Sequence, residues 1–243
     1  MFEGHAGVLL LIVLSLALAL VHLVADRFPI FGIVPTNVTL SGAGGVSVVY
    51  VFVYVLPKLA AHAGDIVVPS GLDDPVYLLL FAGLLAFFGL ERLARVADAG
   101  SERALSAVIP AEPVFWMHIV GFAVYNIAIG HLLVSGALID DPVPFAIAMA
   151  LHLFGNDEAL RALHRDAYHR IGRWILAAAV LLGASTAVVV TVSPELLLGI
   201  LAALAGGITF NALKEELPRD RDSSFWGFAT GALAFWILAA FWL

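Results

Sequence analysis

Cysteine is absent from the 243-residue chain, which excludes disulfides, thiolate metal sites and any inference about the redox compartment. Charge is scarce too, because Asp, Glu, Lys and Arg make up 13% of the residues, against about a quarter in soluble domains. Lysine occurs only as Lys58 and Lys214. The net charge of −7, without a basic run, excludes the electrostatic footprint of a nucleic-acid-binding protein.

What the chain has in excess is apolar sequence. Hydrophobic residues make up 62% of it, and the mean hydropathy is +1.01. This composition predicts an integral membrane protein that forms one transmembrane domain over residues 1–243. The apolar run 7–25 follows Glu3 rather than a base, so we interpret it as a retained first helix and not as a signal peptide.

Eight stretches are long and apolar enough to span a bilayer. A spanning segment must satisfy its own backbone hydrogen bonds, so each is predicted to be a helix. Most prolines fall at or near the predicted ends, where a helix tolerates them. The predicted spans are 6–25, 38–57, 75–94, 114–136, 142–160, 172–192, 195–213 and 224–243.

The distribution of Lys and Arg predicts the orientation. If the eight spans alternate in direction, eleven of the twelve basic residues fall on one side and only Lys58 falls on the other. The basic side is therefore predicted to be cytoplasmic, with both termini outside the cell membrane. The predicted outer side is acidic and would attract cations, although acidic loops could equally serve solubility.

A short internal similarity links two of the spans. Residues 43–47 read Ala-Gly-Gly-Val-Ser, and residues 205–209 read Ala-Gly-Gly-Ile-Thr; each segment is followed by a Leu-Pro pair, at 56–57 and at 217–218. The predicted orientation gives these helices opposite directions, as in an inverted repeat. Close helix packing alone would also select such small residues.

Polar side chains inside the predicted spans cluster in the fourth and fifth. Asn126 and His152 are expected to approach each other near mid-membrane, because costly polar groups avoid lipid. Imidazole and amide oxygen could form a cation site, or the pair could form an interhelical hydrogen bond that only holds helices together. His22 lies near a span end, and His164 and His169 are interpreted as surface residues. The other candidates are Tyr125, His118, His131, Asn156, Asp157 and Asn211.

Five segments of the chain are similar to segments of a known family: GGVSVVYVFVYVLPKL, GLLAFFGLERL, VYNIAIG, ALHLFGND and AGGITFNALKEELP. Through them the chain resembles the ZIP family of divalent-metal transporters over nearly its whole length. The resemblance implies an all-α bundle of eight transmembrane helices, with inverted halves of three helices around a central pair.

The metal motifs of that family are reduced in this chain. The positions that carry acids in the family hold Ile129, Leu153 and Asn156, and Tyr125 replaces a histidine. The metal ligands implied by the resemblance and by the neighbouring polar residues are Asn126, His152, Asn156 and Asp157. His118 and His131 are candidate substitutes for the missing ligands.

We therefore expect a divalent-cation transporter for zinc-like ions with a reduced site, embedded in the lipid bilayer. A non-transporting membrane scaffold and a transporter of a non-metal solute stay open as alternatives, as does a homodimer. No cofactor is expected beyond a divalent cation as substrate. An enzyme is not expected, because no nucleophile and base occur at a plausible spacing.

Overall fold

The computed structural model describes residues 5–24, 34–65, 75–99, 111–139, 141–216 and 223–241. Within these ranges the chain is helical and contains no strand. Two π-helical segments, η3 (Tyr50–Val55) and η5 (Tyr168–Gly172), join α2 to α3 and α6 to α7, and the 3₁₀ turn η4 (Ala63–Asp65) follows α3. The α-helices are α1 (His5–Val24), α2 (Thr36–Val49), α3 (Leu56–Ala61), α4 (Pro75–Ala99), α5 (Ala111–Ser135), α6 (Pro142–Ala167), α7 (Arg173–Val189), α8 (Pro194–Glu216) and α9 (Phe225–Ala240).

Six helical stretches of the described chain are long and apolar enough to cross a membrane, and each coincides with a predicted span. The other two predicted spans are also helical. However, α9 has only 16 residues, and α6 contains the polar cluster that starts at His152. The all-α, polytopic membrane fold is therefore confirmed, whereas the count of eight crossings stays a prediction. The six are His5–Val24, Thr36–Ala61, Pro75–Leu93, Pro113–Ser135, Tyr168–Val189 and Pro194–Lys214.

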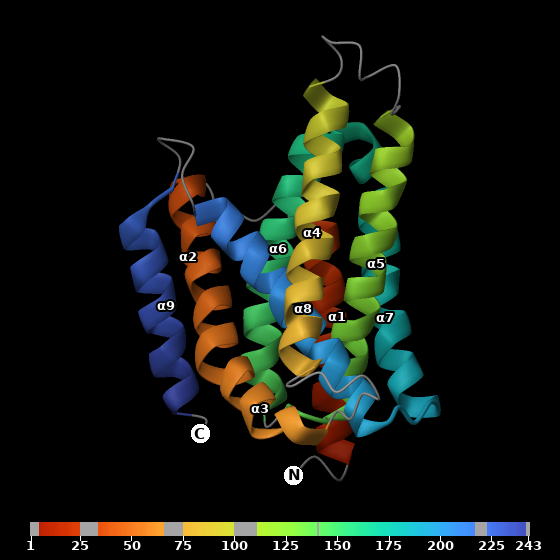
Figure 1. Ribbon diagram of the computed structural model, residues 1–243, viewed down its shortest axis with the longest axis vertical. Helices are drawn as coiled ribbons and strands as arrows, with labels where there is room; N and C mark the ends of the chain where they lie inside the picture. Colours follow the sequence, from red (N-terminus) through yellow and green to blue (C-terminus); the bar gives the residue numbers. More distant parts are fainter. Residues whose placement is uncertain are drawn as a thin grey trace.

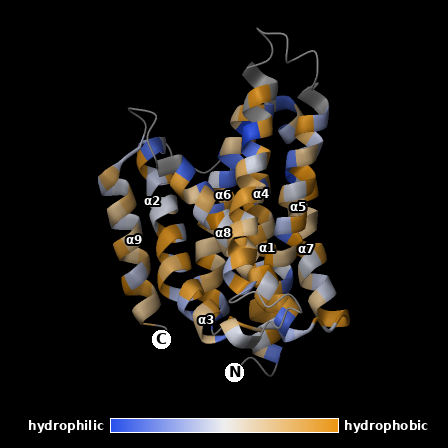
Figure 2. Ribbon diagram, viewed as in Figure 1, coloured by the Kyte–Doolittle hydropathy of each residue, from blue (hydrophilic) through white to orange (hydrophobic). Residues whose placement is uncertain are grey.

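The outer helices expose large apolar side chains, as lipid-facing helices do. On α1, Leu9 is 61% exposed, and on α5 Val124 is 63% exposed. Figure 2 shows hydrophobic residues over much of the visible bundle. Such a surface would be unfavourable in water and is favourable against lipid tails.

Helix α6 lies in the middle of the bundle and is mostly enclosed by protein (Figure 1). Ala148, Met149 and Leu153 have no exposed surface. Because its neighbours are other helices rather than lipid, α6 can carry polar side chains that find protein partners. This position explains why the helix with the polar cluster is less hydrophobic than the others.

Glycines let three helix pairs approach until their backbones touch. A Cβ atom added at Gly130 of α5 would overlap the Val180 carbonyl oxygen of α7, and one at Gly183 of α7 would overlap the Ile127 carbonyl oxygen of α5. Similar reciprocal contacts join α4 to α8, through Gly83 and Gly206, and α2 to α9, through Gly45, Gly227 and Gly231. Small residues at such seams are typical of membrane helix packing.

The start of α1 and the end of α9 lie at one end of the bundle, and the end of α4 and the start of α5 lie at the opposite end (Figure 1). Helix α3, with Lys58, lies at the end that carries the termini. We refer to the opposite end, where α6 meets α7 near Arg161, Arg170 and Arg173, as the basic end.

Replacing Gly206 with alanine should destabilise the protein by about 1–3 kcal/mol, because the new methyl group overlaps the Leu80 backbone of α4 and forces α4 and α8 apart. The matched control is Gly89→Ala in α4, where an added Cβ meets no atom within 4 Å. Unfolding in detergent measures both variants. Equal stability of the two would contradict the backbone contact.

Candidate functional site

Helices α1, α5 and α6 bring six polar side chains together inside the bundle. Each is at most 5% exposed, so none of them reaches lipid or solvent freely. We call this group the central network. Its members are His22, Tyr125, Asn126, His152, Asn156 and Asp157.

One half of the central network is centred on His22. Its Nδ1 atom lies 2.9 and 2.8 Å from the two carboxyl oxygens of Asp157, and its Nε2 atom lies 2.9 Å from Oδ1 of Asn126. The Asn126 amide nitrogen donates to the Phe122 carbonyl oxygen at 2.8 Å, which turns Oδ1 toward His22. The Nε2–H of His22 therefore donates to Asn126.

The contact between His22 and Asp157 requires a proton between the two groups. A bare Nδ1 lone pair and an ionised carboxylate at 2.8 Å would repel each other. The proton belongs either to an imidazolium facing a carboxylate or to a carboxylic acid that donates to a neutral ring. The pair has no net charge in either arrangement, which lowers the cost of removing it from water. Each of the two side chains is only 1% exposed.

The other half of the central network is centred on His152. Its Nε2 atom lies 2.9 Å from the Tyr125 hydroxyl and 3.0 Å from the Asn156 amide nitrogen. The amide nitrogen can only donate, so Nε2 is the acceptor. A cation could bind this nitrogen only after displacing both donors.

All four predicted metal ligands lie in the central network, but their partners differ from the predicted ones. Asn126 and His152 both lie in the bundle interior, where Asn126 bonds to His22, and His152 bonds to Tyr125 and Asn156. Both halves involve α5 and α6, but only the half centred on His22 reaches α1, because adjacent residues on an α-helix point about 100° apart.

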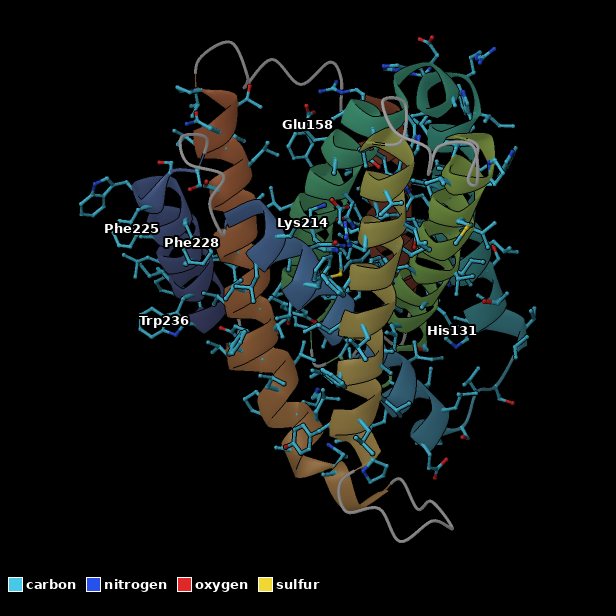
Figure 3. All side chains as sticks on the ribbon, turned by 45° about the horizontal axis from the view of Figure 1, so that its top comes forward. His131, Glu158, Lys214, Phe225, Phe228 and Trp236 are labelled. Atoms are coloured by element: carbon cyan, nitrogen blue, oxygen red, sulfur yellow. The ribbon has the colours of Figure 1, made fainter. Side chains whose placement is uncertain are left out.

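Asp157 takes part without any unwinding of α6. The helix continues without a break through Gly155, two residues before Asp157. Asp157 turns toward α1, whereas Glu158 turns outward and pairs with Arg161. Figure 3 shows Glu158 near the end of α6.

His22 is the member of the central network that the sequence analysis set aside as a histidine near a span end. It is 2% exposed. A signal was available, because Ser15 and His22 are seven residues apart and therefore share the buried face of α1 with Leu18 and Ala19.

The two candidate substitute ligands lie outside the central network. His131 bonds to the Thr186 hydroxyl at 3.2 Å, and His118 bonds to His164 and to the Leu90 carbonyl oxygen. His164 was predicted to be a surface residue and is instead half-buried against α5. In the described parts of the chain, no three His, Asp or Glu side chains form a ready-made metal site.

Two small cavities adjoin the network on the side of α8. One lies between α2, α6 and α8 and is lined by Ser47, His152, Asn156 and Asn211; the other lies among α4, α5, α6 and α8. Asn156 and Asn211 line both. The Asn211 amide nitrogen is buried and has no hydrogen-bond partner among the described residues. The amide therefore offers a hydrogen-bond donor to a polar ligand in this region.

A third cavity lies toward the end that carries the termini. Tyr50, Tyr54, Lys58 and Asp141 contribute to its lining. The Lys58 ammonium group donates to the Leu138 carbonyl oxygen at 2.9 Å, which holds it at the cavity wall. Both signs of charge therefore occur at this opening.

No family model matches the chain, and no curated protein matches it.

Replacing Asp157 with alanine should destabilise the protein by about 3–5 kcal/mol, because the change leaves His22 buried without its charge partner. The adjacent control Glu158→Ala should cost at most about 1 kcal/mol, since the Glu158–Arg161 pair is partly exposed. Unfolding in mixed detergent micelles provides the free energies.

A double-mutant cycle tests the pairing itself. The variant with both His22→Ala and Asp157→Ala should lose less stability than the sum of the two single variants. Additive losses would show that the two side chains do not interact.

Proposed function

We propose that the protein is a ZIP-type membrane transporter that carries a divalent, zinc-like cation through the central network. The observation that carries the proposal is the buried contact of the Asp157 carboxylate with the His22 imidazole and, through that ring, with the Asn126 amide. Ionisable groups at membrane depth are costly, and in transport proteins they mark substrate and ion pathways.

The chemistry of these groups suits such a cation. Imidazole nitrogen and carboxylate oxygen are both zinc ligands, and amide oxygen is a further hard donor. A cation bound between His22 Nδ1 and Asp157 would take the place of the shared proton. Asp157 would offset one of its two charges, with Asn126, His152 and Asn156 as neutral neighbours.

The positions of the cavities support a route through the bundle. One cavity opens toward the end that carries the termini, and two adjoin Asn156 and Asn211 on the way to the basic end. Alternating exposure of the central network to the two ends would move the cation across the membrane. The acidic outer side predicted from the sequence would concentrate cations at the entrance.

The glycine contacts support inverted halves of three helices. Gly45 of α2 contacts the backbone of α9, and Gly206 of α8 contacts the backbone of α4. If α2 and α8 are equivalent, their partners α9 and α4 are the third helices of opposite halves. The short sequence similarity and the backbone packing thus agree on the same symmetry.

A neutral polar solute is the second candidate substrate. The observation that favours it is the unpartnered Asn211 amide nitrogen beside His152 and Asn156. Amide and imidazole groups can exchange hydrogen bonds with such a solute without any net charge. A non-transporting scaffold is the remaining alternative.

Direct titration of the purified protein with zinc should reveal weak binding, because a single carboxylate leaves a dipositive ion poorly compensated in a low-dielectric site. Binding at the central network should weaken further in His152→Ala, and the zinc ion bound there should be lost in Asp157→Asn, whereas Glu158→Gln should match the wild type. Tight binding that survives both changes would place the site elsewhere.

Zinc uptake into proteoliposomes separates the three candidates. A transporter of zinc should show uptake that Asp157→Asn abolishes and Glu158→Gln retains. Absence of both binding and uptake would refute the metal proposal and favour the scaffold or the neutral solute.

The orientation can be tested with single cysteines, because the natural chain contains none. Ala61→Cys, at the exposed end of α3, should react with an impermeant thiol reagent in intact cells. Asp166→Cys, exposed at the basic end, should react only after permeabilisation. The reverse pattern would place the termini in the cytoplasm.

A further inference from the structure

A second pair of histidines lies nearer the basic end than the central network. His118 of α5 and His164 of α6 face each other with 3.0 Å between Nδ1 of the first and Nε2 of the second. His118 precedes Asn126 by eight residues, and His164 follows Asp157 by seven, so about two helical turns separate the pair from the network. The central network does not use either side chain.

His118 is held in the orientation that a metal ligand needs. Its Nε2 atom lies 3.1 Å from the Leu90 carbonyl oxygen of α4, which can only accept a hydrogen bond. Nε2 therefore carries a hydrogen, and on a neutral ring Nδ1 presents its lone pair to His164. Metal-bound histidines are typically oriented by such a bond from the other ring nitrogen to a carbonyl or a carboxylate.

His164 reaches this position through a break in helical geometry. Its φ and ψ angles are −133° and 38°, which are not helical values although the residue lies within α6. The Phe115 ring contacts the imidazole edge-on, with 5.4 Å between centroids and 74° between planes. The backbone break and the aromatic contact together fix the ring opposite His118.

The surroundings also provide an acid. Glu91 and His118 line the same cavity, and the Glu91 carboxylate accepts from the Lys214 ammonium group at 3.1 Å. Figure 3 shows Lys214 on α8. A cation at the histidine pair could thus draw on Glu91 or on water for further ligands, while Lys214 shares the negative charge of the carboxylate.

We infer that His118 and His164 form a second binding site for a divalent transition metal that favours imidazole, such as zinc or copper. Zinc–nitrogen bonds of about 2.0–2.1 Å in tetrahedral geometry place two nitrogens roughly 3.3 Å apart. The observed 3.0 Å requires only a small opening of the pair. The site goes beyond the proposed transport function, since it requires no movement of the cation through the bundle.

The competing interpretation is a structural hydrogen bond in which the Nε2–H of His164 donates to Nδ1 of His118. This bond and the metal exclude each other, because both occupy the space between the two nitrogens. Metal binding at the pair therefore decides between them.

The experiment uses the 243-residue chain in detergent with Asp157→Asn, which removes the carboxylate of the central network. Copper(II) is the probe, and electron paramagnetic resonance counts its imidazole ligands. We expect one bound ion with two imidazole nitrogens, and zinc should displace it. His118→Gln and His164→Gln should each remove one imidazole signal and weaken binding by at least about tenfold.

His169→Gln is the matched control, because this histidine lies at the same end of the bundle but outside the pair. It should retain both the affinity and the two-imidazole signal. Gel filtration and circular dichroism verify that each variant is folded. Because His164 is only half-buried, His164→Gln should disturb the fold less than His118→Gln.

The absence of a two-imidazole copper signal in Asp157→Asn would overturn the inference in favour of the hydrogen bond. Retention of that signal in folded His164→Gln would overturn it as well. Either result leaves zinc uptake by the wild-type protein unaffected, so the failure of this site is distinguishable from the failure of the proposed function.

Discussion

The contact between His22 and Asp157 is the interaction on which the interior of this bundle depends. A carboxyl group that is 1% exposed within a membrane-spanning fold cannot rely on water, so a partner from another helix must meet it. That requirement fixes α1 against α6. Asn126 then fixes α5, because its amide bridges the His22 ring and the carbonyl group of its own helix at Phe122.

Helices α5 and α6 contribute to both halves of the central network, and the two halves do not compete for partners. Tyr125 and Asn126 are adjacent on α5, as are Asn156 and Asp157 on α6, and adjacent side chains point in different directions around a helix. One residue of each couple turns to His22 and the other to His152. The polar residues of α6 are therefore distributed over two faces, which is feasible because protein encloses most of this helix.

The sequence predicted the helices well because a membrane span must satisfy its backbone hydrogen bonds locally. The run 75–94, for example, corresponds to the candidate span Pro75–Leu93. The membership of the candidate site was also largely predictable, since Asn126, His152, Asn156 and Asp157 are polar residues in apolar surroundings.

The contacts among these residues were not predictable, because they depend on how each helix is rotated against its neighbours. His22 looked like a span-end residue and is buried. His164 lies between Arg161 and Arg165 in the sequence, yet the bend in α6 turns it inward. The rotation of each helix within the bundle decides whether such a histidine reaches water or the next helix.

The reciprocal glycine contacts have a mechanical consequence. Where two backbones touch, there is no side chain whose rotamer could change. The glycine contacts therefore make three rigid helix pairs: α5 with α7, α4 with α8 and α2 with α9. Between the rigid helix pairs, for instance where α6 faces α8 near Asn156 and Asn211, side chains make the contacts and small cavities lie among them. Compliance in this molecule is therefore concentrated at those side-chain seams.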